Sequence, residues 1–363
     1  MRRKELTPTN REEKNMSWMA KAMVSAVAGA AILSGAAALT SASAQEVKGP
    51  KVSWKFNVWG KSRAFTKDVE AWGKYVDEKT GGNFKIKVYY GDQLGGRKQN
   101  LDNIKAGVFE AGKICAAYHP GKNQSLTVLN MPFVPIKNFN HQRKVAESIH
   151  NHPIVVKELK DKWNVMVFSS SQLPQYEFMG RGEAPKTLDA WKGMTVRALG
   201  GLADAMRKLG TSIATMTAPE VYQALDRGAA DAVSFPSTYA HSAYKIDEVA
   251  DWFTTNLAPG TNDCPNIMSI DAWNKLPPQY QKLMMEAKEI GYKALEEAYA
   301  SKDKENLPKW RKHLTEVVYS DAELANFQKI GGQPVYDKWV ADNKDKFDAQ
   351  GLLDTMLAAA KAK

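Results

Sequence analysis

The sequence lacks the short motifs that mark the common enzyme classes. Its 363 residues contain no HExxH, CxxC, GxSxG or Walker A pattern. The glycines of GDQLGG, residues 91–96, do not have the GxGxxG spacing of a dinucleotide-binding loop. One SxxK match, Ser242 to Lys245, has no accompanying SDN segment, and the one KTG tripeptide, residues 79–81, lies 163 residues before it, so the β-lactamase pattern is not met. We therefore expect a protein without catalytic nucleophile, metal site or cofactor.

The sequence also lacks a concentrated charge. Its net charge is +10, and residues 1–44 hold six Lys or Arg against three Asp or Glu, which leaves an excess of seven cations in the rest. These are scattered, whereas nucleic-acid recognition needs clustered Lys and Arg together with a reader motif. We expect no nucleic-acid partner and a weak preference for anions.

Apolar runs are short after residue 44, and none approaches the roughly 20 residues of a membrane span. Before that point, Lys21 is followed by a run of small and apolar residues and then by Ala42-Ser43-Ala44. A charged segment, an apolar segment and an A-x-A site in this order are typical of a signal peptide. The alternative is a membrane anchor, but the run is rich in Ala and Gly and ends in a cleavable site. We predict a signal peptide over residues 1–44, cleavage after Ala44 and a soluble periplasmic protein.

From residue 51 onward, strand-like and helix-like patterns alternate. The first half predicts strands at 52–59, 84–91, 111–118 and 164–171, with helices at 64–82, 96–108 and 141–162. The second predicts strands at 194–199, 211–217 and 229–236, with helices at 201–210 and 218–228. Such alternation predicts parallel sheets covered by helices.

The rest of the chain reads as a returning strand and then helices. A strand is expected within residues 260–275, followed by one long helix from Pro278 to about Pro308 and further helices. We predict an α/β protein with domain I at 45–168 plus the returning strand, and domain II at 169–258. Residues 276–363 would form the long helix that spans both domains and the C-terminal helices that pack on them. Two such domains predict an interdomain cleft with a hinge.

Ligands of open α/β sheets lie outside the carboxyl ends of the strands. In the first predicted sheet those ends carry Trp59, Tyr118 and His119. In the second they carry Arg197, Met216 and Phe235, with Tyr239 shortly after. Large aromatic residues are more often core than ligand contacts, and a lone histidine is more often structural than catalytic. These residues are therefore candidates for a binding site, with a core role as the alternative for each aromatic residue.

Several segments together resemble a known family. TVR at 195–197, LGT at 209–211, EVYQALDRGAADA at 220–232 and WNKLP at 273–277 match its characteristic pattern, and DQLGG at 92–96 and MPF at 131–133 also fit. The chain, from about residue 52 to beyond 300, resembles the DctP-type extracytoplasmic solute-binding proteins of TRAP transporters. The resemblance implies a two-domain binding-protein fold. It also implies capture of a small organic acid in the periplasm, closure about a hinge, and delivery to the membrane subunits of a TRAP permease. We expect a monomer.

The resemblance assigns a role to Arg197, which stands where the family has an arginine that holds the ligand carboxylate. A planar guanidinium suits this task because it donates two parallel hydrogen bonds to a carboxylate. Two departures from the family pattern bear on the ligand. Tyr176 and Glu177 replace a second arginine, and Phe235 replaces an asparagine. The exchange of polar for aromatic groups predicts a monocarboxylate with an apolar or aromatic body, including a 2-hydroxy or 2-keto acid. A dicarboxylate is the alternative if Arg181 or Arg63 turns into the cleft.

Glu177 has two readings that the sequence leaves open. It accepts hydrogen bonds from a hydroxyl or amine of the ligand, or it forms a salt bridge with Arg181 or Lys186. Trp59, Tyr118, Phe235 and Tyr239 would surround the ligand body together with Met216, and Tyr118 or His119 would donate to an oxygen beside the carboxylate.

The two cysteines, Cys115 and Cys264, permit a disulfide in an exported protein, and two buried thiols are the alternative. In the fold that the resemblance implies, the strand with Cys115 lies beside the returning strand that begins near Cys264, so we predict that they are bonded. Two other functions remain open: an exported enzyme, or a ligand-sensing module, on the same scaffold.

Overall fold

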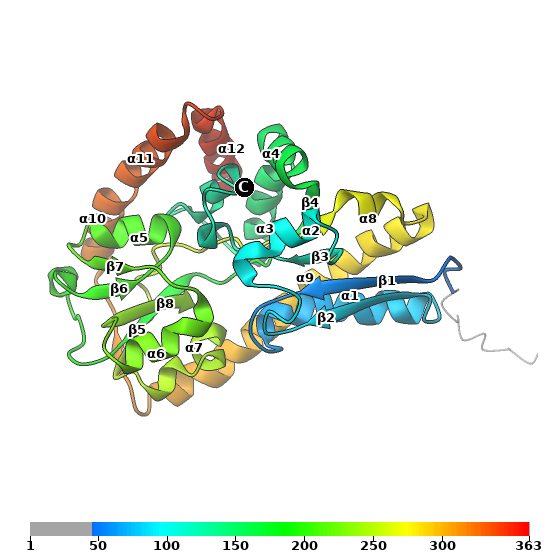
Figure 1. Cartoon of the computed structure of the whole chain (residues 1–363). Coiled ribbons are helices and arrows are strands. Elements are labelled where there is room, and N and C mark those ends of the chain that lie inside the picture. Colours follow the sequence, from blue (N-terminus) through cyan, green and yellow to red (C-terminus); the bar gives the residue numbers. More distant parts are fainter. Residues whose placement is uncertain (1–45, 363) are drawn as a thin grey trace, which may run out of the picture. The chain divides into compact units, whose positions relative to one another are not determined.

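The computed structural model describes residues 46–362, which contain two β-sheets with helices packed against them (Figure 1). The predicted signal peptide and its cleavage site therefore lie outside the described residues. Within the described residues, no helix is both long enough and apolar enough to cross a membrane.

The first sheet has the strand order β2-β1-β3-β10-β4. Its strands are β1 (Val52–Asn57), β2 (Phe84–Tyr89), β3 (Ala111–Lys113), β4 (Val165–Ser169) and β10 (Asn266–Ser269). The strand β1 runs parallel to β2 and β3, whereas β10 is antiparallel to both β3 and β4. The returning strand expected within residues 260–275 therefore lies inside this sheet.

Helix α1 (Lys67–Lys79) packs beside this sheet through one apolar face. Val69, Trp72 and Val76 recur at helical spacing and are buried. The Trp72 ring meets Phe168 of β4 edge to face, with the ring centroids 4.9 Å apart. A Cβ atom on Gly291 would come within 2.0 Å of Nε1 of Trp72, so only glycine allows this close approach. The other helices of this half are α2 (Asn100–Lys105), α3 (Phe139–His150), α4 (Pro153–Trp163) and α8 (Ile270–Asn274).

The second sheet has the strand order β11-β9-β5-β8-β6-β7. Its strands are β5 (Tyr176–Gly180), β6 (Thr195–Arg197), β7 (Ser212–Ala214), β8 (Ala232–Pro236), β9 (Trp252–Thr254) and β11 (Thr315–Val317). The strands β7, β6 and β8 are parallel to one another, and β5 is antiparallel to β8 and β9. Helices α5 (Gly200–Arg207), α6 (Val221–Asp226) and α7 (Tyr239–Ala243) follow β6, β7 and β8. Thr217 and Glu220 form the predicted capping box just before α6.

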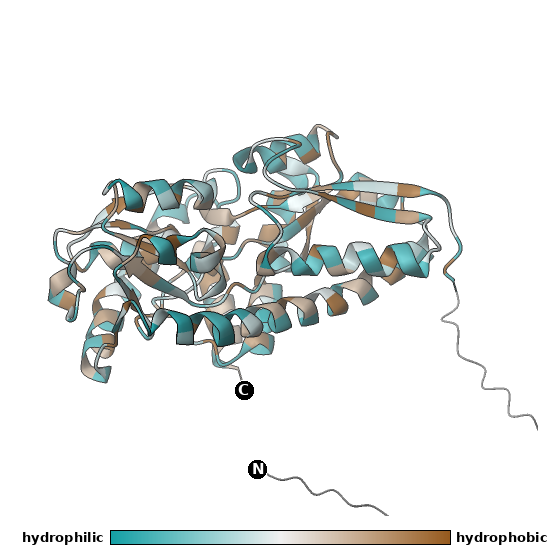
Figure 2. Ribbon diagram, turned by 90° about the horizontal axis from the view of Figure 1, so that it is seen from below, coloured by the Kyte–Doolittle hydropathy of each residue, from teal (hydrophilic) through white to brown (hydrophobic). Residues whose placement is uncertain are grey.

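Helix α9 (Pro278–Trp310) contacts elements from both halves. It packs along α1 beside the first sheet and reaches α7 beside the second (Figures 1 and 2). Pro278 occupies the first turn, where its missing N–H costs nothing, and Pro308 stands in the last turn. The C-terminal helices follow: α10 (Asp321–Gly331), α11 (Gln333–Asn343) and α12 (Ala349–Lys361). Of these, α12 packs on α3, whereas α10 and α11 contact α5.

Five short elements were not expected from the sequence. These are β5, β9, β11, α7 and α8, of three to five residues each. A three-residue strand is too short for an alternating pattern, so β9 and β11 gave no signal. The strand expected at 111–118 is also shorter than predicted. It ends at Lys113, and Ala116–Tyr118 form a 3-10 turn.

Candidate functional site

A cavity lies where segments from the two sheets meet. It is lined by residues that follow β1 and β3 on one side and by β5, β6, β8 and α7 on the other. Its water-accessible volume is about 30 Å³, which is room for one or two water molecules. The lining residues are Trp59, Arg63, Phe65, Cys115, Tyr118, Leu173, Tyr176, Arg197, Ala218, Phe235, Pro236, Tyr239, Ala240, Tyr244 and Cys264.

Arg197, the last residue of β6, places its guanidinium in this lining. Its Nη1 donates to the carbonyl oxygen of Ser234 at 2.6 Å, and its Nε and Nη2 donate to that of Met216 at 3.2 and 3.0 Å. These bonds hold the guanidinium in one orientation. They use three of its five N–H groups, so two donors remain for another acceptor.

The charge of Arg197 is buried without an acidic partner. The residue is 1% exposed, and no salt bridge among residues 46–362 includes it. Its guanidinium carbon lies 4.8 Å from the centroid of the Phe235 ring, a cation–π contact that compensates part of the lost hydration. A buried cation is normally paired because its desolvation is expensive. The site is thus suited to the carboxylate of a ligand.

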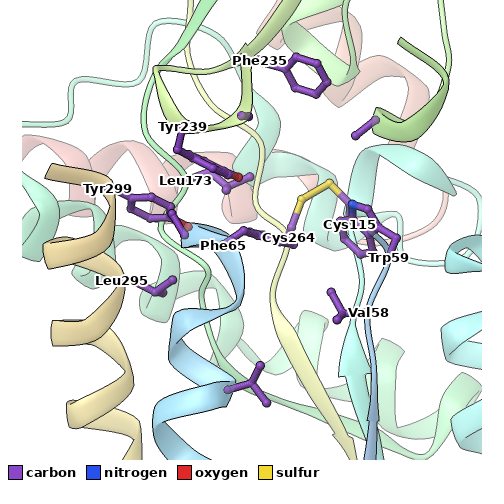
Figure 3. Close-up of a cluster of buried hydrophobic side chains, with 14 of the residues drawn as sticks. Val58, Trp59, Phe65, Cys115, Leu173, Phe235, Tyr239, Cys264, Leu295 and Tyr299 are labelled. Atoms are coloured by element: carbon purple, nitrogen blue, oxygen red, sulfur yellow. A yellow bond between two sulfur atoms is a disulfide. The ribbon is translucent and has the colours of Figure 1, made fainter. Parts of the chain in front are cut away.

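Aromatic rings form most of the remaining wall. Trp59 contacts Phe65 and Tyr118, with ring centroids 5.3 and 5.5 Å away. Phe235 stacks on Tyr244 at 5.3 Å with the rings almost parallel. Figure 3 shows Trp59, Phe235 and Tyr239 around the disulfide that joins Cys115 to Cys264. Walls of this kind bury apolar surface of a ligand and offer edge and face contacts to a ring.

Arg63 brings a second cation to the cavity. It lies in the loop between β1 and α1, where its Nη1 donates to the carbonyl oxygens of Trp59 and Lys61, both at 2.8 Å. Its guanidinium carbon is 4.8 Å from the Phe65 ring and 5.5 Å from the Tyr244 ring. No salt bridge among the described residues includes Arg63. The lining therefore contains two cations and no carboxylate, so the cavity favours anions.

A second enclosed space lies among α3, α12 and the segment before β10, and its chemistry is different. Its walls are mostly aliphatic, and its one carboxylate is Asp263. That carboxylate already accepts hydrogen bonds from Ser170 at 2.8 Å and from His150 at 2.6 Å. That carboxylate is thus satisfied within the protein. The side-chain amide of Asn262 in the same lining has no hydrogen-bond partner among residues 46–362, but the lining contains no Lys or Arg that could hold a carboxylate.

A comparison with known families now adds to this geometry. The family model described as bacterial extracellular solute-binding protein, family 7, matches residues 57–343. The chain belongs to this family. Its members are periplasmic solute-binding components of transporters, and the TRAP solute-binding proteins among them bind small organic acids.

Individual relatives show the range of ligands within the family 7 proteins. A monocarboxylate 2-oxoacid-binding periplasmic protein of Nostoc sp. is 26% identical over 328 residues, which cover 85% of this chain and 88% of the relative. A TRAP solute-binding protein of Rhodoferax ferrireducens, solved with copurified benzoate, is 21% identical with a TM-score of 0.75, over 85% of this chain and 98% of that one. Another from Sulfurospirillum deleyianum, solved with succinate, is 18% identical with a TM-score of 0.71, over 86% and 100% of the two chains. These likenesses confirm the predicted fold of a two-domain TRAP solute-binding protein.

The cavity of this family 7 protein contains five of the eight ligand contacts predicted from the sequence. These are Trp59, Tyr118, Arg197, Phe235 and Tyr239. Two further aromatic residues, Phe65 and Tyr176, lie in the same lining.

Glu177 is placed elsewhere, contrary to both sequence-based readings. Its Oε1 accepts from the backbone N–H of Ala258 at 3.0 Å, and its Oε2 accepts from the hydroxyl of Thr254. The side chain does not line the cavity, and Arg181 instead donates to the carbonyl oxygen of Asp226. Burial raises the pKa of Glu177 to about 7. Its carboxyl group therefore serves the structure of the loop after β9.

Two further predicted contacts act differently or not at all. The Met216 side chain does not line the cavity, but its carbonyl oxygen orients Arg197 as described above. His119 is buried outside the lining, with Nδ1 against Oδ1 of Asn123, and burial lowers its pKa. It follows a 3-10 turn that directs Tyr118 rather than His119 into the cavity.

Two charged or polar lining residues were not among the predicted ligand contacts. Tyr244 belongs to a loop after the unexpected helix α7, and Arg63, expected at the cleft only in the dicarboxylate alternative, lies four residues beyond the end of a predicted strand without any motif. The available signal for Arg63 was its position in the first strand-to-helix loop, because such loops border the cleft in α/β proteins.

Proposed function

We propose that this protein captures a small organic monocarboxylate in the cavity around Arg197 and delivers it to the membrane subunits of a TRAP permease. The ligand has an apolar body, either an aromatic ring or the short chain of a 2-oxo or 2-hydroxy acid. The observation that carries this proposal is a buried guanidinium, 1% exposed, with two unused donors and no carboxylate partner among residues 46–362.

The rest of the lining supports the apolar body. Phe235 cannot hydrogen-bond a second carboxylate, and Leu173 and Ala240 are apolar. The second cation, Arg63, already donates to two carbonyl oxygens of its own loop. Burying an aromatic ring contributes about 25 cal/mol per Å² before the cost of ordering the ligand. The benzoate found with the relative from Rhodoferax ferrireducens and the monocarboxylate 2-oxoacids of the relative from Nostoc sp. are acids of these two kinds.

Binding requires that the two sheets separate and close again, because a volume of about 30 Å³ is too small for such an acid. Several contacts cross between the two sides of the cavity. The N–H of Ala218 donates to the hydroxyl of Tyr118 at 3.0 Å, and Arg97 donates to the hydroxyl of Thr217 at 2.9 Å. These bonds are few and partly exposed, so they are suited to forming and breaking in each cycle.

The proposed hinge consists of the segments that cross between the sheets, residues 170–175 and 255–265. They lie beside one another, since the N–H of Tyr176 donates to the carbonyl oxygen of Gly260 at 2.8 Å. The hydroxyl of Thr261 donates to the carbonyl oxygen of Leu173 at 2.9 Å. Small rotations in two adjacent extended segments are a common way to close a two-domain binding protein.

Isothermal titration calorimetry with a panel of acids tests the proposed ligand class. Benzoate, 4-hydroxybenzoate, mandelate, benzoylformate and pyruvate represent the proposed class, and succinate and malate represent dicarboxylates. We expect at least one monocarboxylate to bind with micromolar or better affinity and to be recovered unchanged. Tight binding of succinate with no response to any monocarboxylate would refute the proposed class, and no binding of any organic acid would refute the function.

A further inference from the structure

A broad groove adjoins the cavity and is open to solvent. Residues 60–64 form one side, and α7 with the loop after it forms the other. Its water-accessible volume is about 570 Å³, compared with about 30 Å³ for the cavity. Arg63, Tyr239 and Tyr244 line both spaces, so these three side chains stand between them.

All charged side chains that line the groove are cationic: Lys61, Arg63, Lys245 and Lys302. Lys245 and Lys302 pair with Glu248 and Glu305, which lie outside the lining. Lys61 is exposed, and among residues 46–362 it takes part in no salt bridge. A concave surface with cations of this kind raises the local concentration of anions and the rate at which they arrive.

The boundary between groove and cavity is closed by a weak contact. Arg63 is hydrogen-bonded only to carbonyl oxygens of its own loop, and it reaches the other side through the face of the Tyr244 ring at 5.5 Å. On that side, Tyr244 stacks on Phe235, which is the ring beside Arg197.

Gly60 explains how the loop comes so near. It has a φ of +69°, and a Cβ atom there would lie 2.9 Å from the hydroxyl of Tyr244. The backbone of the loop therefore packs against Tyr244 as closely as a glycine permits. Because no hydrogen bond or salt bridge within the described residues joins Arg63 to Tyr244, this contact opens at small cost.

We propose that the groove is the entrance for the organic anion, and that Arg63 and Tyr244 form the gate between the groove and the binding cavity. Lys61 attracts the anion, the gate opens, the carboxylate passes Arg63 and reaches Arg197, and the gate closes behind it. This inference rests on the proposed function, and it assigns Lys61 to arrival and the Arg63–Tyr244 contact to retention.

Stopped-flow measurement of tryptophan fluorescence separates these roles, because Trp59 lies in the cavity lining. The probe is benzoate, or pyruvate and then succinate if benzoate gives no signal. Lys61→Glu reverses the unpaired charge of the groove. At an ionic strength of about 20 mM we expect its association rate constant to fall by about 3- to 10-fold, and at about 0.5 M salt the difference should disappear. Its dissociation rate should stay within about twofold of the wild type.

Lys48→Glu is the matched control. Lys48 is also exposed, and its carbonyl oxygen accepts from Gln279 at the start of α9, whereas Lys302 stands near the other end of that helix. Gln279 and Lys302 are separated by 23 residues of helix, which corresponds to about 35 Å along the α9 axis. This distance is beyond the screening length at moderate salt. The control should leave both rate constants unchanged. Equal association rate constants for the Lys61→Glu and Lys48→Glu variants at low salt would refute the proposal that the groove is the entrance.

A double-mutant cycle tests the gate. Arg63→Ala and Tyr244→Ala should each raise the dissociation rate constant by about 10-fold, and the double variant should release the probe no more than about twofold faster than either single variant. Such non-additivity identifies two residues that act through one contact. If the two substitutions multiply their effects on the dissociation rate constant, or if neither single variant changes it, the proposal that Arg63 and Tyr244 form a gate is refuted. If the wild-type protein binds no acid of the calorimetric panel, the proposed function fails, and the inference fails with it.

Discussion

Replacement of Arg197 by alanine removes the group on which the proposed site depends. The guanidinium is held by the carbonyl oxygens of Met216 and Ser234, so its two remaining N–H groups are fixed before a ligand arrives. Loss of a buried, charge-assisted pair costs about 2–5 kcal/mol in binding. The dissociation constant of the tightest acid in the panel should therefore rise by about 30- to several thousand-fold.

Arg197→Lys provides a sharper test of the geometry. An ammonium group has three N–H donors, and two of them are needed for the same carbonyl oxygens. One donor remains, so a bidentate carboxylate contact is not available. We expect affinity to fall by about 10-fold or more although the charge is preserved.

Calorimetry measures both variants, and Arg181→Ala is the matched control. Arg181 follows β5 in the same half of the protein, but its side chain is 46% exposed and it contacts Asp226 instead of the cavity. Its replacement should leave affinity within about twofold. Near-native affinity of the Arg197→Ala variant, with a preserved melting temperature, would refute the role of Arg197.

Three further predictions concern the fold and its motion. The disulfide closes a loop of 149 residues, so the Cys115→Ala/Cys264→Ala variant should lose about 4–5 kcal/mol of unfolding free energy in urea, and an unchanged midpoint would contradict this. Burial raises the pKa of Glu177 to about 7 from its usual value of 4.5. The folded protein therefore holds a proton that the unfolded chain has released, and stability falls as pH rises through this window. Between pH 4 and 8 the wild type should lose about 3 kcal/mol more than Glu177→Gln, whereas parallel pH profiles would argue against a buried carboxyl group. Small-angle scattering should show a smaller radius of gyration with saturating ligand, and an unchanged radius would count against the hinge.

Regular elements and the position of Arg197 at the cavity were predictable because their signals are local. The alternation of strands and helices, the capping box of Thr217 and Glu220, and the long helix from Pro278 depend on nearby residues, and the structure has them where the sequence indicates. Arg197 could be singled out from the sequence because a cation at the end of an apolar strand is unusual.

The prediction that Glu177 contacts the ligand or pairs with a nearby cation was wrong for a physical reason. All five residues of β5 are buried, so the strand has no alternation of apolar and polar residues that would indicate which side chains point toward the cavity. The positions of Tyr244 and Arg63 depend on contacts between segments more than 150 residues apart along the chain. Such contacts leave no trace in the local pattern.

A crystal structure with the tightest-binding acid of the calorimetric panel tests the central claim most directly. The account predicts the carboxylate within about 3 Å of the guanidinium nitrogens of Arg197, with the body of the acid against Phe235 and Trp59. A carboxylate held by Arg63 alone, or an acid bound in the space beside Asp263, would contradict it.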